Sequence, residues 1–187
     1  MNEIIAFVEL MGTMHDLDAA LEDLSGFDFV RSVFAVTGQY DFLVEVRCKS
    51  MWDLGDALDK LTGRVWVTGS RSSKVKRIIK EPEELVYVDV DRNKEKNMLK
   101  SGLMAFMGIG VRSNLLKPLL LKIVDIPQIK RIYETTGSHD LLIELWTKNM
   151  YEYSLVVEEI HNYEFLRATN TAFILRVKRH LLAEEKE

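Results

Sequence analysis

The chain has 187 residues, with 25 Lys and Arg against 29 Asp and Glu, a formal net charge of −4, and 47% hydrophobic residues. These values are ordinary for a globular protein and argue against a general affinity for nucleic acid or membranes. The single cysteine, Cys48, excludes a disulfide framework within the chain. No stretch is apolar for long enough to cross a bilayer, and no leader pattern opens the chain, so we expect a cytoplasmic protein.

The first half of the chain predicts the order β-α-β-β-α-β. Runs of apolar and β-branched residues predict strands at 4–10, 29–36, 41–46 and 65–79. Apolar residues at helical spacing predict one helix that begins after Thr13 or Asp16 and ends at Gly26. The same spacing predicts a second helix around 54–61 that ends at Gly63.

The second half predicts the same order. We expect its strands at 103–109, 128–135, 140–147 and 165–178, and its helices at 113–124 and 150–161. Pro118 falls inside the first of these helices and should shift or kink its first turn. Each half then forms a four-stranded antiparallel sheet with both helices on one face, so the fold class is α+β with two tandem ferredoxin-like domains.

An internal repeat supports this division. The segment Thr37-Gly38-Gln39-Tyr40-Asp41 returns as Thr136-Gly137-Ser138-His139-Asp140, 99 residues later, and the same offset relates Ala6-Phe7 to Ala105-Phe106 and Glu45 to Glu144. A match sustained at one offset indicates two copies of one fold. We therefore predict domains at 1–82 and 100–187, joined by a linker at 83–99 that has room for a short strand.

The third strand of each copy predicts two different sheet faces, because side chains alternate along a strand. Phe42, Val44 and Val46 suit the helices, as Leu141, Ile143 and Leu145 do in the second copy. The opposite face carries Leu43, Glu45 and Arg47, and in the second copy Leu142, Glu144 and Trp146. Such a mixed face suits a contact between sheets that also holds a ligand, although it could also be a solvated face with a few apolar residues.

These features together resemble the effector-binding domain of the Lrp/AsnC transcription regulators, often called the RAM domain. The turn Thr37-Gly38-Gln39-Tyr40-Asp41 is close to the family's Gly-x-Tyr-Asp, and its second copy has His139 in place of Tyr. The final-strand motif reads Thr169-Asn170-Thr171 in the second copy and Ser70-Arg71-Ser72 in the first. The family's N-terminal helix-turn-helix has no counterpart, since the first predicted strand already begins at Ile4. The resemblance therefore implies a tandem effector domain without direct DNA binding.

The resemblance also implies a ligand. Relatives bind small effectors, typically amino acids, where such domains meet. The ammonium of an amino acid needs a carboxylate, and its carboxylate needs N–H groups or hydroxyls. The candidate ligand-binding residues are Thr37, Gly38, Gln39, Tyr40, Asp41, Ser70, Ser72, Thr136, Gly137, Ser138, His139, Asp140, Thr169 and Thr171.

Each of these residues also has a structural interpretation. Thr-Gly-x-x-Asp is a good hairpin turn, in which Gly accepts a positive φ and Asp binds the local backbone. Serine and threonine hydroxyls are at home in strands. Glu45 and Glu144 could hold a ligand ammonium or pair with Arg47 or across an interface.

The remaining patterns in the sequence are less informative about function. The basic stretch from Arg64 to Lys80 could bind anions or nucleic acid, or could be a charged strand edge that resists aggregation. The calcium-loop pattern that begins at Asp89 fails, because Lys94 stands where Gly is needed. The histidines and Cys48 show no metal-ligand spacing. We expect no metal and no cofactor.

Three functions compete. The first is a non-enzymatic module that binds an amino acid and regulates transcription through homo-oligomers or mixed oligomers with helix-turn-helix regulators. The second is an enzyme on a tetrapyrrole or other organic acid, with His139, Tyr40 and Arg47 as acid, base and anion-binding groups. This second hypothesis rests on analogy of fold alone. The third is a purely structural partner that blunts another regulator.

Overall fold

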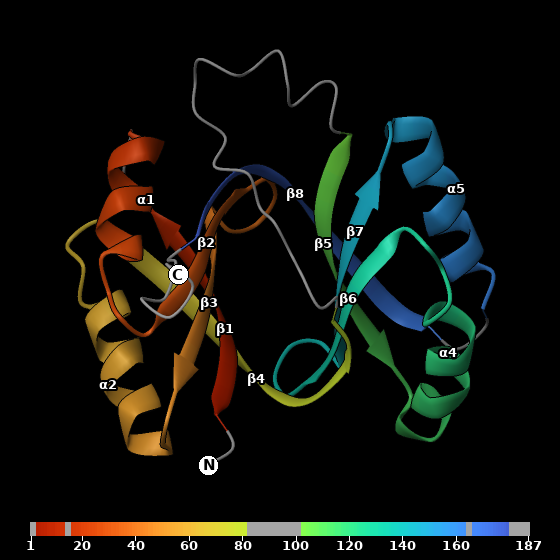
Figure 1. Cartoon of the computed structure of the whole chain (residues 1–187), viewed down its shortest axis with the longest axis horizontal. Helices are drawn as coiled ribbons and strands as arrows, with labels where there is room; N and C mark the ends of the chain where they lie inside the picture. The colour runs from red at the N-terminus through yellow and green to blue at the C-terminus, as the bar shows by residue number, and fades with distance from the viewer. Residues whose placement is uncertain (1–2, 14–15, 82–101, 164–165, 180–187) are drawn as a thin grey trace, which may run out of the picture. The chain divides into compact units, whose positions relative to one another are not determined.

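The computed structural model describes residues 3–13, 16–81, 102–163 and 166–179 (Figure 1). The linker that we expected at 83–99 lies outside these residues. The described chain divides into two compact units, and each repeats the predicted order of strands and helices. The α+β, tandem ferredoxin-like class is thus confirmed.

The first unit contains, among described residues, 3–13, 16–74 and 175–179. Its sheet is antiparallel, with the strand order β2-β3-β1-β4. Figure 1 shows both helices on one face of these strands. The elements are β1 (Ile4–Gly12), α1 (Leu17–Ser25), β2 (Val30–Val36), β3 (Phe42–Cys48), α2 (Met51–Thr62) and the first part of β4 (Val67–Lys80).

The second unit contains, among described residues, 75–81, 102–163 and 166–174. Its antiparallel sheet has the order β8-β5-β7-β6 and again carries its helices on one face (Figure 1). The elements are β5 (Leu103–Val111), the 3₁₀ turn η2 (Ser113–Leu115), α4 (Leu116–Ile123), β6 (Ile129–Thr135), β7 (Leu141–Thr147), α5 (Met150–His161) and most of β8 (Leu166–Arg179).

The long final strand of each copy is divided between the units. Residues 67–74 of β4 pair with β1, whereas its later part pairs with β6, with Val75 opposite Thr135 and Arg77 opposite Glu134. The end of β8 likewise groups with the first unit, where Arg176 and Lys178 form ion pairs with acidic residues of α1. The sequence repeat did not indicate this division of β4 and β8. The offset shows which strands are equivalent, but not which strands they pair with.

The helices begin where the sequence supplies a polar cap. Asp16 accepts hydrogen bonds from Asp18 N at 3.0 Å and Ala19 N at 3.3 Å, and Ser50 and Asn149 cap α2 and α5 in the same way. Pro118 falls in the first turn of α4, where its missing N–H would have no helical partner. The turn before it is 3₁₀, as a shifted first turn predicts.

Each unit packs its helices on the apolar face of its own sheet. Phe42, Val44 and Val46 lie in the core of the first unit with residues of α1 and α2, which confirms the predicted helix-facing side of β3. In the second unit Leu141, Ile143 and Leu145 occupy the corresponding places. Burial of these side chains is the main source of stability in both units.

Two glycines offer a test of these backbone assignments. Gly38 has φ 110°, which a side chain disfavours, whereas Gly55 lies inside α2 and an added methyl would meet nothing within 4 Å. We expect Gly55→Ala to raise the free energy of unfolding by about 1 kcal/mol, because Ala is the better helix former. Gly38→Ala should lower it by about 1 kcal/mol or more. Urea denaturation of both variants measures this; a Gly38→Ala variant as stable as the parent would contradict the turn assignment, and a destabilised Gly55→Ala variant would contradict the helix expectation.

Candidate functional site

The repeated aspartates tie each hairpin turn to the end of the unit's first strand. Asp41 Oδ2 accepts the N–H of Gly12 at 2.8 Å, and Asp140 Oδ2 accepts that of Val111 at the same distance. At both places the strand register shifts, between Met11 and Gly12 and at the equivalent point of β5. A register shift turns an N–H out of the ladder, and the carboxylate takes it.

The glycines of the two turns have the predicted backbone. Gly38 has φ 110° and Gly137 φ 109°, so the turn role of both is confirmed. Residues 38, 39 and 136–138 are exposed, which leaves the tips of both turns open to solvent. The structure therefore assigns the Gly and Asp of each motif to the turn itself.

In the first unit, three side chains come together beside the turn. Tyr40 is buried, and the guanidinium of Arg71 lies 5.6 Å from the centre of its ring. Glu9 is half-buried on β1 and stands opposite Arg71 of β4 in the strand register. The neighbours of Glu9 along the strand, Val8 and Leu10, point into the helix-covered core, so Glu9 belongs to the helix-free face.

Burial and charge set the protonation of this cluster. Burial raises the pKa of the Glu9 carboxyl, and the charge of Arg71 opposes this shift. Burial also raises the pKa of the Tyr40 hydroxyl, the nearby Glu9 charge adds to the effect, and Arg71 opposes it. Tyr40 therefore keeps its proton at neutral pH and offers an O–H donor.

The second unit has different residues at the same three places. Gly108, His139 and Asn170 replace Glu9, Tyr40 and Arg71 at the repeat offset. The His139 ring lies over Gly108, where an added Cβ would come within 2.5 Å of it. The two turns therefore share a backbone but differ in chemistry: the first has a carboxylate, a phenol and a cation, and the second has an imidazole and an amide.

The predicted hydroxyls lie on the other side of the sheet. Thr169 contacts His161 at 2.8 Å and Thr171 accepts from the Tyr153 hydroxyl at 3.0 Å, and both partners are on α5. Ser70 and Ser72 of the first unit stand opposite the core residues Leu10 and Val8 in the same way. The structure thus brings Tyr40 and its turn together with Arg71, and does not bring the flanking hydroxyls to them.

Sequence reasoning missed Glu9 and Arg71. The signal was present, because side chains alternate along a strand and the residue between Ser70 and Ser72 must face the other way. Glu9 in turn is a charged residue inside an otherwise apolar strand, a common mark of a specific role.

Glu45 and Glu144 have the same burial but different cations. Both are fully buried on the helix-free face of their sheets. Arg47 donates to Glu45 Oε1 through Nη2 at 3.0 Å and Nε at 3.2 Å. In the second unit the pairing partner comes from the neighbouring strand, with Arg131 Nη1 3.6 Å from Glu144. The pairing with Arg47 that the sequence offered as one alternative is thus present.

The basic stretch at 64–80 is partly neutralised within each unit. Arg64 pairs with Asp23 at 2.9 Å, and Arg77 pairs with Glu134 at 2.5 Å. Within the described ranges, no three His, Cys, Asp or Glu side chains gather as a metal site would require. No helix of the described chain is both long and apolar enough to cross a membrane.

The comparisons with known proteins agree with this architecture. The family model described as "Lrp/AsnC ligand binding domain" matches residues 5–85 and 104–181, so the chain belongs to this family and carries the domain twice. A relative, the HTH-type transcriptional regulator FL11 of Pyrococcus furiosus, is 24% identical over 171 residues, covering 90% of this chain and 93% of its own. The part of this chain that the structure describes shows no helix-turn-helix.

Solved structures with the same fold include enzymes. The siroheme decarboxylase NirDL aligns with a TM-score of 0.70 at 11% identity, over 96% of this chain and 74% of that one. A chlorite dismutase mutant from Candidatus Nitrospira defluvii aligns with a TM-score of 0.54 at 14% identity, over 92% of this chain and 90% of that one. Identities this low show a shared fold alone. Family and sequence relatives place the chain among the ligand-binding modules of transcription regulators.

The clamp between turn and strand can be tested in the second unit. Asp140→Ala removes the acceptor of the Val111 N–H, and we expect the free energy of unfolding to fall by about 1–3 kcal/mol. Asp140→Asn keeps an acceptor oxygen and should lose less. Denaturant unfolding of both variants measures the difference; equal losses would show that charge, and not the hydrogen bond, is what matters there.

Glu9 predicts a pH-dependent stability. Its pKa is raised in the folded state, so the folded form is penalised once Glu9 ionises, and stability falls as pH rises through that raised pKa. Glu9→Gln mimics the protonated form. We expect the variant to be more stable than the parent at pH 7, with the difference closing as pH falls below the ordinary glutamate value. Urea titrations at several pH values check this, and a difference independent of pH would refute it.

Proposed function

We propose that the protein is a regulatory module that binds an amino acid at the cluster of Glu9, Tyr40 and Arg71 in its first unit. The single observation that supports this most is the convergence of an anion, a cation and a protonated phenol beside the turn of a family ligand-binding domain. Each group matches one part of an amino acid. The exposed turn tip at Gly38 and Gln39 adds backbone N–H groups in reach of solvent.

The roles follow from charge. Arg71 would bind the α-carboxylate and Glu9 the ammonium, while Tyr40 would donate its hydroxyl and flank the ligand with its ring. A bound ammonium favours the ionised form of Glu9, so binding should release a proton wherever the raised pKa leaves Glu9 partly protonated. Affinity should then increase with pH in that range.

The second unit has no such set. Gly108 and Asn170 supply neither the carboxylate nor the cation, and His139 fills the space over Gly108. We therefore propose one amino-acid site per chain, in the first unit. The replacement of Tyr40 by His139 at the repeat offset is thus one part of a difference in ligand chemistry between the two units.

Regulation would act through assembly. We propose that the module forms homo-oligomers, and also mixed oligomers with regulators that carry a helix-turn-helix. The similarity to FL11, an HTH-type regulator, supports this class of partner. A ligand changes an assembly only if it binds two assembly states with different affinity. The oligomer size must therefore respond to the effector.

A calorimetric screen of the twenty common amino acids tests the proposal, with light scattering on the same samples. We expect saturable binding of at least one amino acid at one site per chain, and a change of oligomer size. Arg71→Ala should weaken binding about tenfold or more, because it leaves the carboxylate unpaired. Asn170→Ala, at the equivalent place in the second unit, is the matched control and should bind as the parent does. Absence of binding across the whole screen, or equal loss in both variants, would overturn the proposal.

An enzyme remains the second candidate, supported by the fold shared with siroheme decarboxylase, one structure of which is a complex with an iron-uroporphyrin III analogue. Of the three groups considered for it, Arg47 is engaged by Glu45 and Glu3 and lies at the end of β3 away from Tyr40. The absorbance of freshly purified protein, and its titration with an iron porphyrin, separates the two functions. A saturable Soret shift without amino-acid binding would favour the enzyme.

A further inference from the structure

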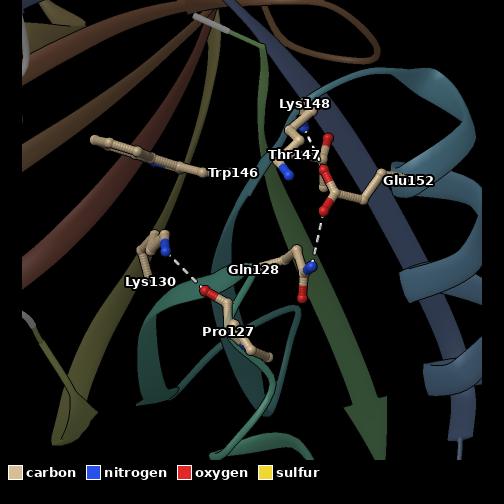
Figure 2. Close-up of a pocket in the computed structure, with 7 residues that line it drawn as sticks. All are labelled: Pro127, Gln128, Lys130, Trp146, Thr147, Lys148 and Glu152. Atoms are coloured by element: carbon tan, nitrogen blue, oxygen red, sulfur yellow. Dashed lines mark hydrogen bonds between the residues drawn. The ribbon is translucent and has the colours of Figure 1, made fainter.

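A second site of different chemistry lies in the second unit, away from the turn. A pocket of about 400 Å³ opens where β7 ends and α5 begins, at the opposite end of β7 from Asp140 (Figure 2). This volume is in the range of small-molecule sites. Its lining comprises Pro127, Gln128, Lys130, Trp146, Thr147, Lys148 and Glu152.

A hydrogen bond to a buried carboxylate fixes the orientation of the Trp146 indole. Its Nε1 donates to Glu144 Oε1 at 2.6 Å, and Glu144 is fully buried and paired with Arg131. A ring anchored through its N–H to a buried carboxylate keeps one orientation, so it offers a preorganised surface for stacking. Figure 2 shows Trp146 along the same side of the pocket as Lys130.

Two lysines give the pocket a positive charge. Lys130 Nζ donates to Pro127 O at 2.7 Å, which uses one of its three N–H groups, and Lys148 follows directly on β7. Burial lowers the pKa of Lys80, and the nearby charge of Lys130 lowers it further. Lys80 itself donates to the carbonyl oxygens of Val124 and Ile126.

The one carboxylate among the lining residues, that of Glu152, already accepts hydrogen bonds from other groups of the protein. Glu152 Oε2 accepts the Lys148 N–H at 2.5 Å, and Oε1 accepts from Gln128 Nε2 at 2.9 Å (Figure 2). These bonds, with the charges of Lys148 and Lys130, lower the pKa of Glu152, so it is ionised at neutral pH. The charges of two lysines then lie near one carboxylate whose oxygens are already engaged, and the pocket favours an anion.

We propose that this pocket binds a small aromatic anion, with the ring against Trp146 and a carboxylate or phosphate between Lys130 and Lys148. A zwitterionic amino acid would bring its ammonium to the two lysines, so this ligand class differs from the effector of the first unit. The first unit has Arg47 and Phe29 where the pocket has Trp146 and Gln128, so the repeat does not supply a second such site. The proposal stands independently of the amino-acid site.

Titration of the full chain with phenylacetate and with phenyl phosphate tests the proposal, with 2-phenylethanol as the neutral counterpart. Tryptophan fluorescence excited at the red edge and calorimetry report binding. We expect saturable binding of at least one anion and at least tenfold weaker binding of the alcohol. Lys130→Ala and Lys148→Ala should each weaken the anion about tenfold, whereas Lys49→Ala, the repeat equivalent of Lys148, should change nothing.

Trp146→Phe should abolish most of the fluorescence change and weaken binding. Because this variant also removes the donor to the buried Glu144, the lysine variants, which leave that bond intact, decide the outcome if it fails to fold. Tighter binding of phenylacetate than of phenyl phosphate, or the reverse, identifies the anionic group that the pocket prefers. Equal binding of the alcohol, or undiminished anion binding in a Lys130→Ala/Lys148→Ala double variant, would overturn the proposal.

Discussion

The hydrogen bond between an aspartate and a displaced strand N–H, made once in each unit, is the interaction on which both sheets depend. Asp41 and Asp140 each fix a hairpin to the first strand of the unit at the point where its register shifts. The backbone of the same residue also bonds on both sides, since Asp41 N donates to Leu10 O and Asp41 O accepts from Val36 N. Without this acceptor the shifted strand would leave an N–H unpaired. The most conspicuous repeat of the sequence is therefore structural first, and the chemistry of the unit is built around it.

The two copies diverged on their helix-free faces while their cores stayed alike. Each keeps a buried glutamate in the middle of the sheet, but its cation comes from the same strand in one unit and from the adjacent strand in the other. Trp146 of the second copy stands at the position of Arg47, and there Arg131 of the adjacent strand is a cation for the buried glutamate. A buried carboxylate must be paired, and either solution meets that need. The second unit thus has an aromatic side chain where the first has an arginine.

The sequence was sufficient to predict the elements, their order and the helix-facing sides of β3 and β7, because these follow from local periodicity and caps. The turn glycines were predictable for the same reason. The partners of the turns were not, since Glu9 and Arg71 meet Tyr40 only through strand pairing. The hydroxyls at 169 and 171 were proposed as ligand contacts from the final-strand motif of the resemblance, but alternation along β8 directs them to α5. The Trp146 pocket combines residues of two strands and a helix, which no single segment reveals.

The division of β4 has a consequence for any attempt to separate the two halves of the chain. A strand whose first part hydrogen-bonds in one sheet and whose later part hydrogen-bonds in the other makes each copy dependent on its sibling for a complete sheet edge. A gene encoding either copy alone would yield a sheet with an open, unpaired border, which invites aggregation. Deletion of either half would therefore remove a strand-pairing partner, β4 or β6, from the half that remains.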